Sequence, residues 1–304
     1  MKIGLIDVDS FNRAPKYPNL ALMKISAWHK SRGDDVEWWW GFSHYDRVYM
    51  SKVFDETYVP DISEPVNADE IIKGGTGYGL DNKFPDEIEH TYPDYSLYPE
   101  LTKDTAYGFL SRGCPRGCGF CIVAGKEGRK SVKVADLTEW WSGQKNIVLM
   151  DPNLLACRQH MELLHQLIDS GANIDVNQGF DARLLTEQNI DAINQMRIKN
   201  IHFAWDDMRQ SDQVLRGLKL YADMAETKPH GKYGTVYVLT NFGTTMEENL
   251  YRIYTLRDMN YDPYVMIYDK PNAPREIRML QRWCNNRKVF RTEPDFQKYD
   301  PKRG

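Results

Sequence analysis

Three cysteines, Cys114, Cys118 and Cys121, lie close together on a glycine-containing loop that directly follows a short apolar segment. A cubane iron–sulfur cluster used for electron transfer normally takes four cysteine ligands. Three thiolates on one loop can hold three irons of such a cluster and leave the fourth iron open. The sequence therefore predicts a cluster with an open iron, at which chemistry can take place.

Other interpretations of the cysteines fit the sequence less well. Structural zinc sites usually pair two C-x-x-C knuckles or add nearby histidines, whereas the remaining cysteines, Cys157 and Cys284, stand alone. Disulfide frameworks are typical of small, cysteine-dense chains, and this chain has five cysteines in 304 residues. Cys157 falls in a predicted helix over 154–170, and a fourth cluster ligand there stays open as an alternative. We interpret Cys157 and Cys284 as small buried apolar residues.

The run from Phe109 to Cys121 resembles the signature of the radical S-adenosylmethionine (SAM) superfamily, including the aromatic Phe120 before the last cysteine. The resemblance implies a 4Fe-4S cluster on the three cysteines, with SAM chelating the open iron through its amino and carboxylate groups. It also implies that an electron from the cluster cleaves SAM to methionine and a 5′-deoxyadenosyl radical, which abstracts hydrogen from a substrate.

Composition and charge narrow the class of protein. A chain of 304 residues that is 41% hydrophobic and 12% aromatic can build one large domain or two ordinary ones. The first apolar stretch is too short for a signal peptide, and no span approaches membrane length. Reduced thiols and an oxygen-sensitive cluster then predict a cytoplasmic protein without a membrane partner. The net charge of -4 argues against indiscriminate binding of phosphate groups.

Short β-rich apolar runs recur along the second part of the chain. Their first residues are 27, 27, 35 and 28 positions apart, which is typical of repeated strand–helix units with parallel strands. With the run before the cysteines, six strands are predicted in an α/β fold. These units resemble the partial (β/α)6 barrel of radical SAM enzymes, in which active-site residues collect at the carboxyl ends of strands. The predicted strands are 107–110, 147–150, 174–177, 201–204, 236–240 and 264–268.

Polar residues follow these strands in a consistent way. The resemblance places Asp151 and Asn153 where the family holds the amino group of SAM. Arg183 is a candidate for the SAM carboxylate, and Asp206 and Asp207 lie where a ribose or ammonium contact is often found. Strand ends also carry polar turn and N-cap residues for purely local reasons, and that alternative stays open. The full predicted cofactor-binding set is Phe120, Asp151, Asn153, Gln178, Arg183, Asp206, Asp207 and Asn241.

Residues 1–98 resemble a shortened cobalamin-binding-type α/β domain of the kind that precedes many radical SAM cores. The cobalt-ligating pattern D-x-H-x-x-G is missing, since none of the seven histidines has a glycine three residues later. We therefore expect no histidine-ligated cobalamin, although binding without a histidine ligand stays open. The predicted organisation is this domain over 1–98, the partial barrel over 99–290 and a polar tail over 291–304.

Three further features bear on ligands and partners. Trp38, Trp39 and Trp40 are interpreted as part of an edge strand, with an interface patch or substrate platform as the alternative. Basic residues follow the cysteines and recur near the C-terminus, where a solvated helix face is favoured over contact with nucleic acid. They are Lys126, Arg129, Lys130, Lys133, Arg275, Arg278 and Arg282.

The sequence thus predicts a radical SAM enzyme that uses an electron donor such as flavodoxin or ferredoxin. Its substrate is not named by the sequence, and nucleic acid and peptide are the candidates. No second set of cluster-binding cysteines is present, which counts against a methylthiotransferase. The alternatives are a non-catalytic iron–sulfur protein for electron transfer or sensing, and a cobalamin-dependent radical SAM methyltransferase.

Overall fold

A computed structural model describes residues 1–301 and divides the chain into two compact units. The first unit contains residues 1–108 and 135–147, and the second contains 109–134 and the chain from 148 onward. The first unit therefore extends beyond the predicted boundary at residue 98. Close packing of Trp140 on Gly108 explains this, because a Cβ atom on Gly108 would lie only 2.3 Å from the indole.

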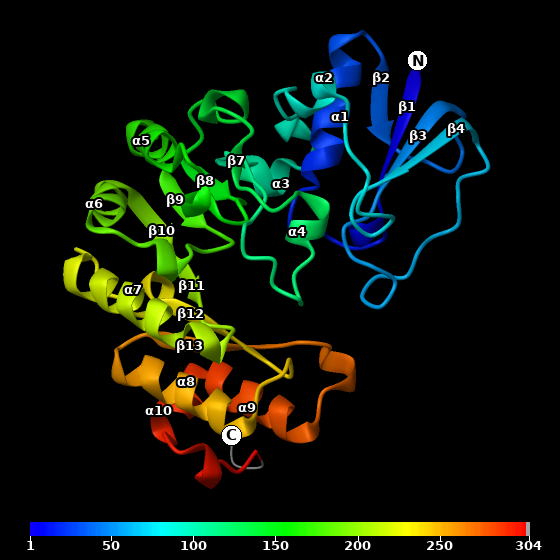
Figure 1. The fold of residues 1–304 in the computed structure, drawn as a ribbon. Helices are drawn as coiled ribbons and strands as arrows, with labels where there is room; N and C mark the ends of the chain where they lie inside the picture. The colour runs from blue at the N-terminus through cyan, green and yellow to red at the C-terminus, as the bar shows by residue number, and fades with distance from the viewer. Residues whose placement is uncertain (302–304) are drawn as a thin grey trace. The chain divides into compact units, whose positions relative to one another are not determined.

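The first unit is built around a parallel sheet of order β2-β1-β3-β4. Helix α1 packs beside this sheet (Figure 1), where Leu22 and Ile25 join Ile3 in a buried apolar cluster. The unit is thus α/β, as predicted. Its strands and helices are β1 (Lys2–Asp7), α1 (Leu20–Ser31), β2 (Asp35–Trp38), β3 (Tyr45–Ser51), β4 (Ala68–Gly74), α2 (Asp86–Glu89), α3 (Pro99–Thr102) and β5 (Thr105–Gly108).

Asn19 fixes the start of α1 and ties it to the end of β3. Its side-chain oxygen accepts a hydrogen bond from the Leu22 N–H at 3.2 Å, which is the usual N-cap bond. Its amide donates to the Ser51 hydroxyl at 2.9 Å. Because β2 and β3 lie on opposite sides of β1, the carboxyl end of β1 is a topological switch point, where open α/β sheets bind ligands.

The second unit carries the cysteines and most of the predicted strand–helix repeats. The division between the units falls within strand β8: Asn146 and Ile147 belong to the first unit, and Val148 and Leu149 belong to the second. The strands and helices from residue 111 onward either flank the cysteines or follow them in the sequence. They are β6 (Ser111–Arg112), α4 (Val123–Lys126), β7 (Val132–Lys133), β8 (Asn146–Leu149), α5 (His160–Ser170), β9 (Asn173–Val176), α6 (Glu187–Gln195), β10 (Arg197–Asn200), β11 (His202–Ala204), α7 (Ser211–Met224), β12 (Thr235–Thr240), α8 (Met246–Asp258), β13 (Asp262–Ile267), α9 (Arg275–Asn285) and α10 (Arg287–Thr292).

The six predicted strands are all present, within two residues of their predicted starts, as β5, β8, β9, β11, β12 and β13. Strand β9 pairs in parallel with β10, and β12 pairs in parallel with both β11 and β13, but the six strands do not form one uninterrupted sheet. Strand β10 pairs with β9, whereas β11 pairs with β12, so the strand order is β10-β9-β8-β5 in one sheet and β11-β12-β13 in another. A parallel α/β architecture is therefore confirmed, and its closure into a partial barrel stays a prediction.

Two predicted segments differ from the structure. The predicted helix over 154–170 is a short 3-10 turn, η4 (Leu154–Ala156), followed by α5 from His160, and the buried Cys157 lies between them. Gly171 closes α5 in the left-handed conformation, as its position predicted.

The predicted polar tail is packed as far as the structure describes it. Phe296 and Phe290 contact the ring of Trp283, whose indole N–H donates to the Glu293 carbonyl at 2.7 Å. Tyr299 is also buried. These aromatic residues give residues 291–301 an apolar anchor, and residues 302–304 of the predicted tail lie outside the described part.

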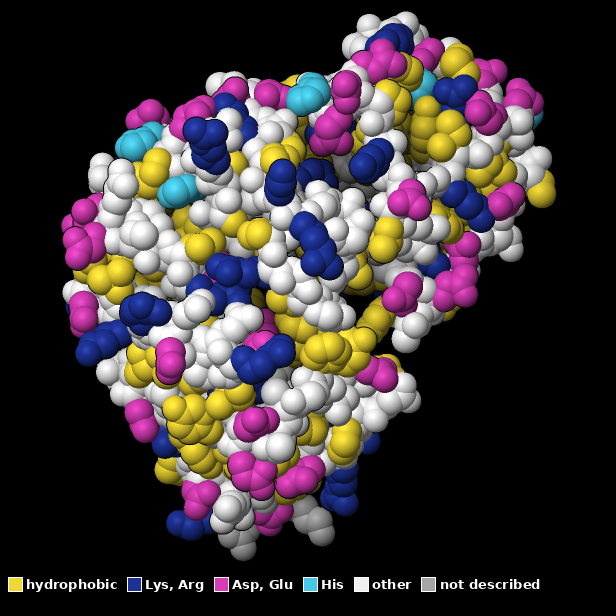
Figure 2. Space-filling model, in the orientation of Figure 1, with side chains coloured by type: hydrophobic (Ala, Val, Ile, Leu, Met, Phe, Trp, Pro, Cys, Tyr) yellow, Lys and Arg dark blue, Asp and Glu magenta, His cyan; other side chains and the backbone are white. Residues whose placement is uncertain are grey.

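No helix among residues 1–301 is long and apolar enough to cross a membrane. Acidic and basic side chains are interspersed over the face shown in Figure 2. The predicted basic helix face is present on α9, where Arg275, Arg278 and Arg282 are exposed.

Gly217 generates a first prediction. On α7, a Cβ atom at this position would lie 1.8 Å from the carbonyl oxygen of Ala182, the first residue of the 3-10 turn η5 (Ala182–Leu184). Gly217→Ala should therefore lower the free energy of unfolding by about 1–3 kcal/mol, measured by urea denaturation. Gly74→Ala, where the new Cβ meets no atom within 4 Å, is the control and should change it by less than about 0.5 kcal/mol. Equal effects would contradict the close approach.

Candidate functional site

The three cysteines lie on a loop, residues 113–131, that is held at its base by a short antiparallel pair. Strand β6 pairs with β7 through Ser111 with Lys133 and Arg112 with Val132. Gly113 begins the loop with a φ of +88°, and a Cβ atom there would lie 2.1 Å from the Lys130 carbonyl oxygen. Glycine is thus required at the point where the two ends of this cysteine loop approach each other.

Within the cysteine loop, backbone hydrogen bonds fix the positions of the ligating residues. The Cys114 N–H donates to the Gly128 carbonyl at 3.2 Å, and the Cys121 N–H donates to the Cys118 carbonyl at 3.0 Å. Cys114 and Cys118 are half-buried, whereas Cys121 is exposed. Burial raises the pKa of the Cys118 thiol, and the positive charge of Arg183 opposes this rise.

Among residues 1–301, no three His, Cys, Asp or Glu side chains converge on a point that could hold a metal ion. In the predicted cluster each thiolate binds a different iron, so the three sulfur atoms need not converge on one ion. The donor set itself, three thiols on one short loop, has the chemistry that an iron–sulfur cluster requires.

Asp151 joins the end of β8 to the entry of the cysteine loop. Its carboxylate accepts hydrogen bonds from the Leu110 N–H at 3.0 Å, the Ser111 N–H at 2.5 Å and the Ser111 hydroxyl at 2.6 Å. Burial raises its pKa to about 6, and these hydrogen bonds oppose the rise. In the structure Asp151 therefore positions the loop, and the predicted contact with the SAM amino group stays a prediction.

Asn153 follows Asp151 by two residues, in the turn after β8, and is 4% exposed. Its amide group donates to the Cys114 sulfur at 3.5 Å and to the Asp181 carboxylate at 3.2 Å. Its side-chain oxygen, Oδ1, is buried and has no hydrogen-bond partner among residues 1–301. Buried acceptors are normally satisfied, so this oxygen is a free acceptor suited to a cationic or N–H donor group beside Cys114.

Asp181 is the centre of a charged cluster. Arg183 binds it through two hydrogen bonds, from Nε at 2.6 Å and from a terminal nitrogen at 2.9 Å. Arg116, which lies between the first two cysteines of the loop, donates to the same carboxylate at 2.7 Å. Burial opposes ionisation of Asp181, but the two guanidinium groups prevail and hold its pKa below the usual value.

Asp206 and Asp207 have different surroundings. Asp206 accepts the Leu239 N–H at 3.1 Å, and burial raises its pKa to about 6. Asp207 binds Arg209, which holds its pKa below the usual value. Asp206 is therefore the better candidate for a ligand contact.

Arg252 of α8 braces the strand ends next to Asp206. It is fully buried and donates to the carbonyls of Trp205 at 2.7 Å and Leu239 at 2.8 Å, and to the Asn249 side chain at 2.6 Å. Burial lowers its pKa to about 10, with Asp206 opposing the change. Arg252 thus holds the residues on either side of Asp206 in place.

Aromatic rings line the approach to the last cysteine. Phe120 makes an edge contact with Phe242, at 5.5 Å between ring centroids, and Phe242 makes another with Tyr268 at 4.8 Å. Asn241 has a φ of +63° and donates to the Tyr268 carbonyl at 2.8 Å, so it shapes the turn that presents Phe242. Gln178 is exposed, and the structure records no hydrogen bond for its side chain among the described residues.

The structure thus connects three of the predicted site residues. Asn153 contacts both Cys114 and Asp181, and Arg183 binds Asp181. Sequence reasoning did not select Asp181, Arg116 or Arg252. The D-x-R pattern at 181–183 was a usable signal, because an acid two residues before an arginine after a strand can pair with it. Arg252 lies in a helix interior, and nothing in its local sequence marks it as buried.

No family model matches the sequence, and no curated protein matches it. Five chains of solved structures match the fold. One of them is the radical SAM methyltransferase TsrM from Kitasatospora setae, solved with cobalamin and a 4Fe-4S cluster bound. The TM-score is 0.62 at 10% sequence identity, covering 88% of this chain and 74% of TsrM. The chain therefore shares its fold with a radical SAM enzyme, which confirms the predicted resemblance at the level of the fold.

Asp206 provides a pH-dependent prediction. The pKa of Asp206 in the folded protein, about 6, lies above the ordinary value of 3.8. The folded state is therefore favoured while Asp206 is protonated, and the free energy of unfolding falls as the pH rises through this range. Asp206→Asn keeps an oxygen for the Leu239 N–H but cannot ionise. Its free energy of unfolding, relative to wild type, should increase by about 1 kcal/mol from pH 5 to pH 7.

The matched control is the neighbouring Asp207→Asn. Because the pKa of Asp207 is held low by Arg209, its carboxylate is ionised throughout this pH range. The difference between this variant and wild type should stay constant from pH 5 to pH 7. A constant difference for Asp206→Asn as well, measured by urea denaturation of the apoprotein, would contradict the raised pKa of Asp206.

Proposed function

We propose that this chain is a radical SAM enzyme, in which a 4Fe-4S cluster on Cys114, Cys118 and Cys121 binds and cleaves SAM. The observation that carries the proposal is the buried side-chain oxygen Oδ1 of Asn153, which has no partner among residues 1–301, on the amide whose nitrogen contacts Cys114. A ligand chelating an iron next to Cys114 through an amino group would offer that oxygen the donor it lacks. The shared fold with a radical SAM methyltransferase supports the same assignment.

The residues around the cysteine loop fit both groups. The three thiols supply the cluster ligands, and Asn153 supplies an acceptor for the SAM ammonium. Two guanidinium groups face one carboxylate at Asp181, so this cluster carries a surplus positive charge that suits the SAM carboxylate and the thiolates. Asp206 is the acceptor we assign to a ribose hydroxyl.

When bound, the cluster supplies the electron that cleaves SAM to methionine and a 5′-deoxyadenosyl radical. The protein's own contribution is to orient SAM and to keep its surroundings fixed. Asp151 holds the entry to the cysteine loop, and Arg252 holds the strand ends beside Asp206. Groups held in this way need little rearrangement when a ligand binds.

Several finer assignments belong to the same proposal. The two parallel sheets would together provide the partial (β/α)6 barrel of the superfamily. A reducing cytoplasm with a flavodoxin or ferredoxin donor suits the thiol ligands. The substrate is a nucleic acid or a peptide, and the exposed rings of Phe242 and Tyr268 offer an apolar contact for it.

A cobalamin-dependent methyltransferase is the second candidate, and the bound cobalamin in TsrM is the observation that favours it. The first unit offers no histidine in the cobalt-ligating pattern. We therefore place this candidate second. It requires a corrinoid bound without a histidine ligand.

The test of the main proposal is the anaerobic formation of 5′-deoxyadenosine and methionine from SAM with dithionite. The reconstituted wild type should form both products. Cys114→Ala, Cys118→Ala and Cys121→Ala should fall to the level of the protein-free control, because each loses one iron ligand. Cys157→Ala is the matched control and should retain activity, since Cys157 is buried between η4 and α5.

The same preparation separates the enzyme from its non-catalytic alternative. Iron and acid-labile sulfide are measured in each variant to show which proteins hold a full cluster. A wild type that holds the full cluster and forms no product, with or without added nucleic acid or peptide, would favour an electron-transfer role. Product from a variant lacking a proposed ligand would contradict the assignment of that cysteine.

The cobalamin alternative has its own test. The reconstituted protein is incubated with hydroxocobalamin, desalted, and examined by visible absorbance for retained corrinoid. We expect none to be retained, because no histidine of the first unit stands in the cobalt-ligating pattern D-x-H-x-x-G. Retention at one corrinoid per chain would contradict this expectation and favour the methyltransferase.

A further inference from the structure

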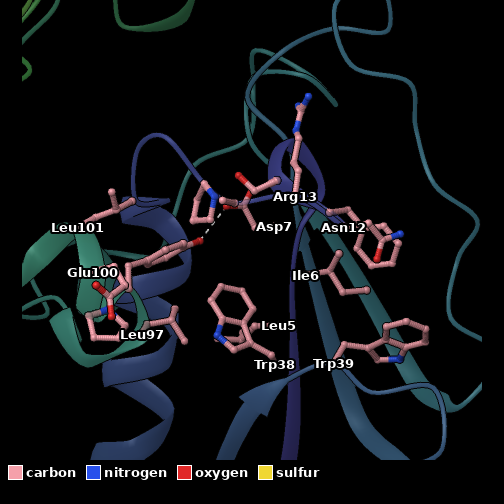
Figure 3. Close-up of a pocket in the computed structure, with 16 residues that line it drawn as sticks. Leu5, Ile6, Asp7, Asn12, Arg13, Trp38, Trp39, Leu97, Glu100 and Leu101 are labelled. Carbon is pink, nitrogen blue, oxygen red and sulfur yellow. Dashed lines mark hydrogen bonds between the residues drawn. The ribbon is translucent and has the colours of Figure 1, made fainter.

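The first unit contains a cavity at the carboxyl ends of β1 and β2, with a volume of about 420 Å³. Small-molecule sites commonly have volumes of about 300–1,000 Å³. Figure 3 shows Leu5, Ile6 and Asp7 of β1 along one side of it and Trp38 and Leu97 on others. The cavity lies beside the switch point of the sheet, the usual place for a ligand in this type of fold.

The walls of this cavity are mostly aromatic and aliphatic. Trp38 makes an edge contact with Tyr98 at 5.2 Å between ring centroids, and it remains 41% exposed. Trp39 is fixed by its indole N–H, which donates to Asn67 at 3.0 Å, and its ring lies near that of Phe11. Rings held at fixed positions with a free face are suited to a flat aromatic ligand.

One buried acid, Asp7, lies among these apolar walls, whereas the other acid of the lining, Glu100, is exposed. The Asp7 carboxylate, 8% exposed, accepts a hydrogen bond from the Tyr98 hydroxyl at 2.9 Å, which the dashed line at Asp7 in Figure 3 marks. Ser10 also bonds to it. A carboxylate has about four acceptor positions, so Asp7 can accept a further hydrogen bond from a ligand. Burial raises its pKa, as expected for an acid in an apolar setting.

The rim of the cavity is tied to the sheet. Asp9, in the 3-10 turn η1 (Val8–Ser10) after β1, accepts the backbone N–H groups of Val53 at 2.6 Å and Phe54 at 3.1 Å. Arg13 donates to the Asp9 carbonyl. Asp9 therefore ties the segment that carries Phe11 and Asn12 to residues 53 and 54, and the Arg13 bond closes this segment back on Asp9.

We propose that this cavity binds a planar two-ring nitrogen heterocycle that carries an amino or N–H donor, with its ring beside Trp38 and its donor on the Asp7 carboxylate. The volume suits one such molecule, and the single buried acceptor sets its orientation. All residues of the cavity belong to the first unit, so the proposal does not depend on the chemistry assigned to the cysteine loop.

The test compares two ligands of the same size. 3-Aminoquinoline carries the donor, and 3-methylquinoline replaces it with a methyl group. Titration of the full chain, followed by saturation-transfer NMR, should show saturable binding of 3-aminoquinoline with a Kd of about 1 mM or tighter. 3-Methylquinoline should bind about tenfold more weakly, since it leaves Asp7 without its donor.

Two variants locate the ligand. Asp7→Asn keeps an acceptor for the Tyr98 hydroxyl but turns an amide N–H₂ toward the ligand's donor, so 3-aminoquinoline should bind about tenfold more weakly. Trp38→Ala removes the aromatic wall and should weaken binding similarly. Trp40→Ala is the control, because Trp40 is 61% exposed and is not among the residues that line the cavity.

The proposal is overturned if both quinolines bind equally, or if Trp38→Ala and Trp40→Ala bind as the wild type does. It is also overturned if one equivalent of hydroxocobalamin or of SAM displaces 3-aminoquinoline, since the first would identify a corrinoid site and the second a SAM site. The comparison of the two ligands on wild type needs no variant, so the test holds even if Asp7→Asn fails to fold.

Discussion

The candidate site depends on one buried carboxylate, that of Asp181. It receives Arg183 from its own turn, Arg116 from the cysteine loop and Asn153 from the end of β8. Three segments distant in sequence are thereby joined at a single acceptor. Removing it would leave two guanidinium groups facing each other in a partly buried setting, which is far more costly than the loss of one hydrogen bond. This ion cluster and the hydrogen bonds of Asp151 together fix the position of the cysteine loop relative to the strand ends.

Two other acids in the second unit have the opposite character. Asp151 is buried and Asp206 partly buried, neither has a direct cationic partner, and burial raises the pKa of each to about 6. Near neutral pH their ionised forms cost stability in the absence of ligand. A cationic ligand beside either carboxylate would offset part of that cost. Acids with a raised pKa are concentrated at functional sites, where a ligand or a reaction uses the shifted protonation equilibrium.

The periodicity of apolar residues in the sequence was sufficient to locate the strands, but it did not show which strands pair with each other in a sheet. Each predicted strand contains enough β-branched and apolar residues to be recognised by itself. The division between β10 and β11 at Ile201 depends on which neighbour each backbone pairs with, and residue type does not record that choice. The cysteine loop was fully visible, since its spacing is local. Arg116 and Arg252 were not, because their partners lie far away in sequence and only the folded chain brings them close.

Both units place their candidate ligand site at the carboxyl ends of parallel strands, but with different side chains. In a parallel sheet all strands end at the same edge, where unpaired N–H groups and short connecting turns make room for polar side chains. In the second unit that edge is filled with charged groups around the cysteine loop, which suits an ionic ligand. In the first unit it is lined mainly with apolar residues, among them tryptophan and leucine, around one buried acid, Asp7. The absence of a cobalt-ligating histidine in that sequence is therefore compatible with a retained ligand site, since burial of a flat ring and one hydrogen bond need no metal.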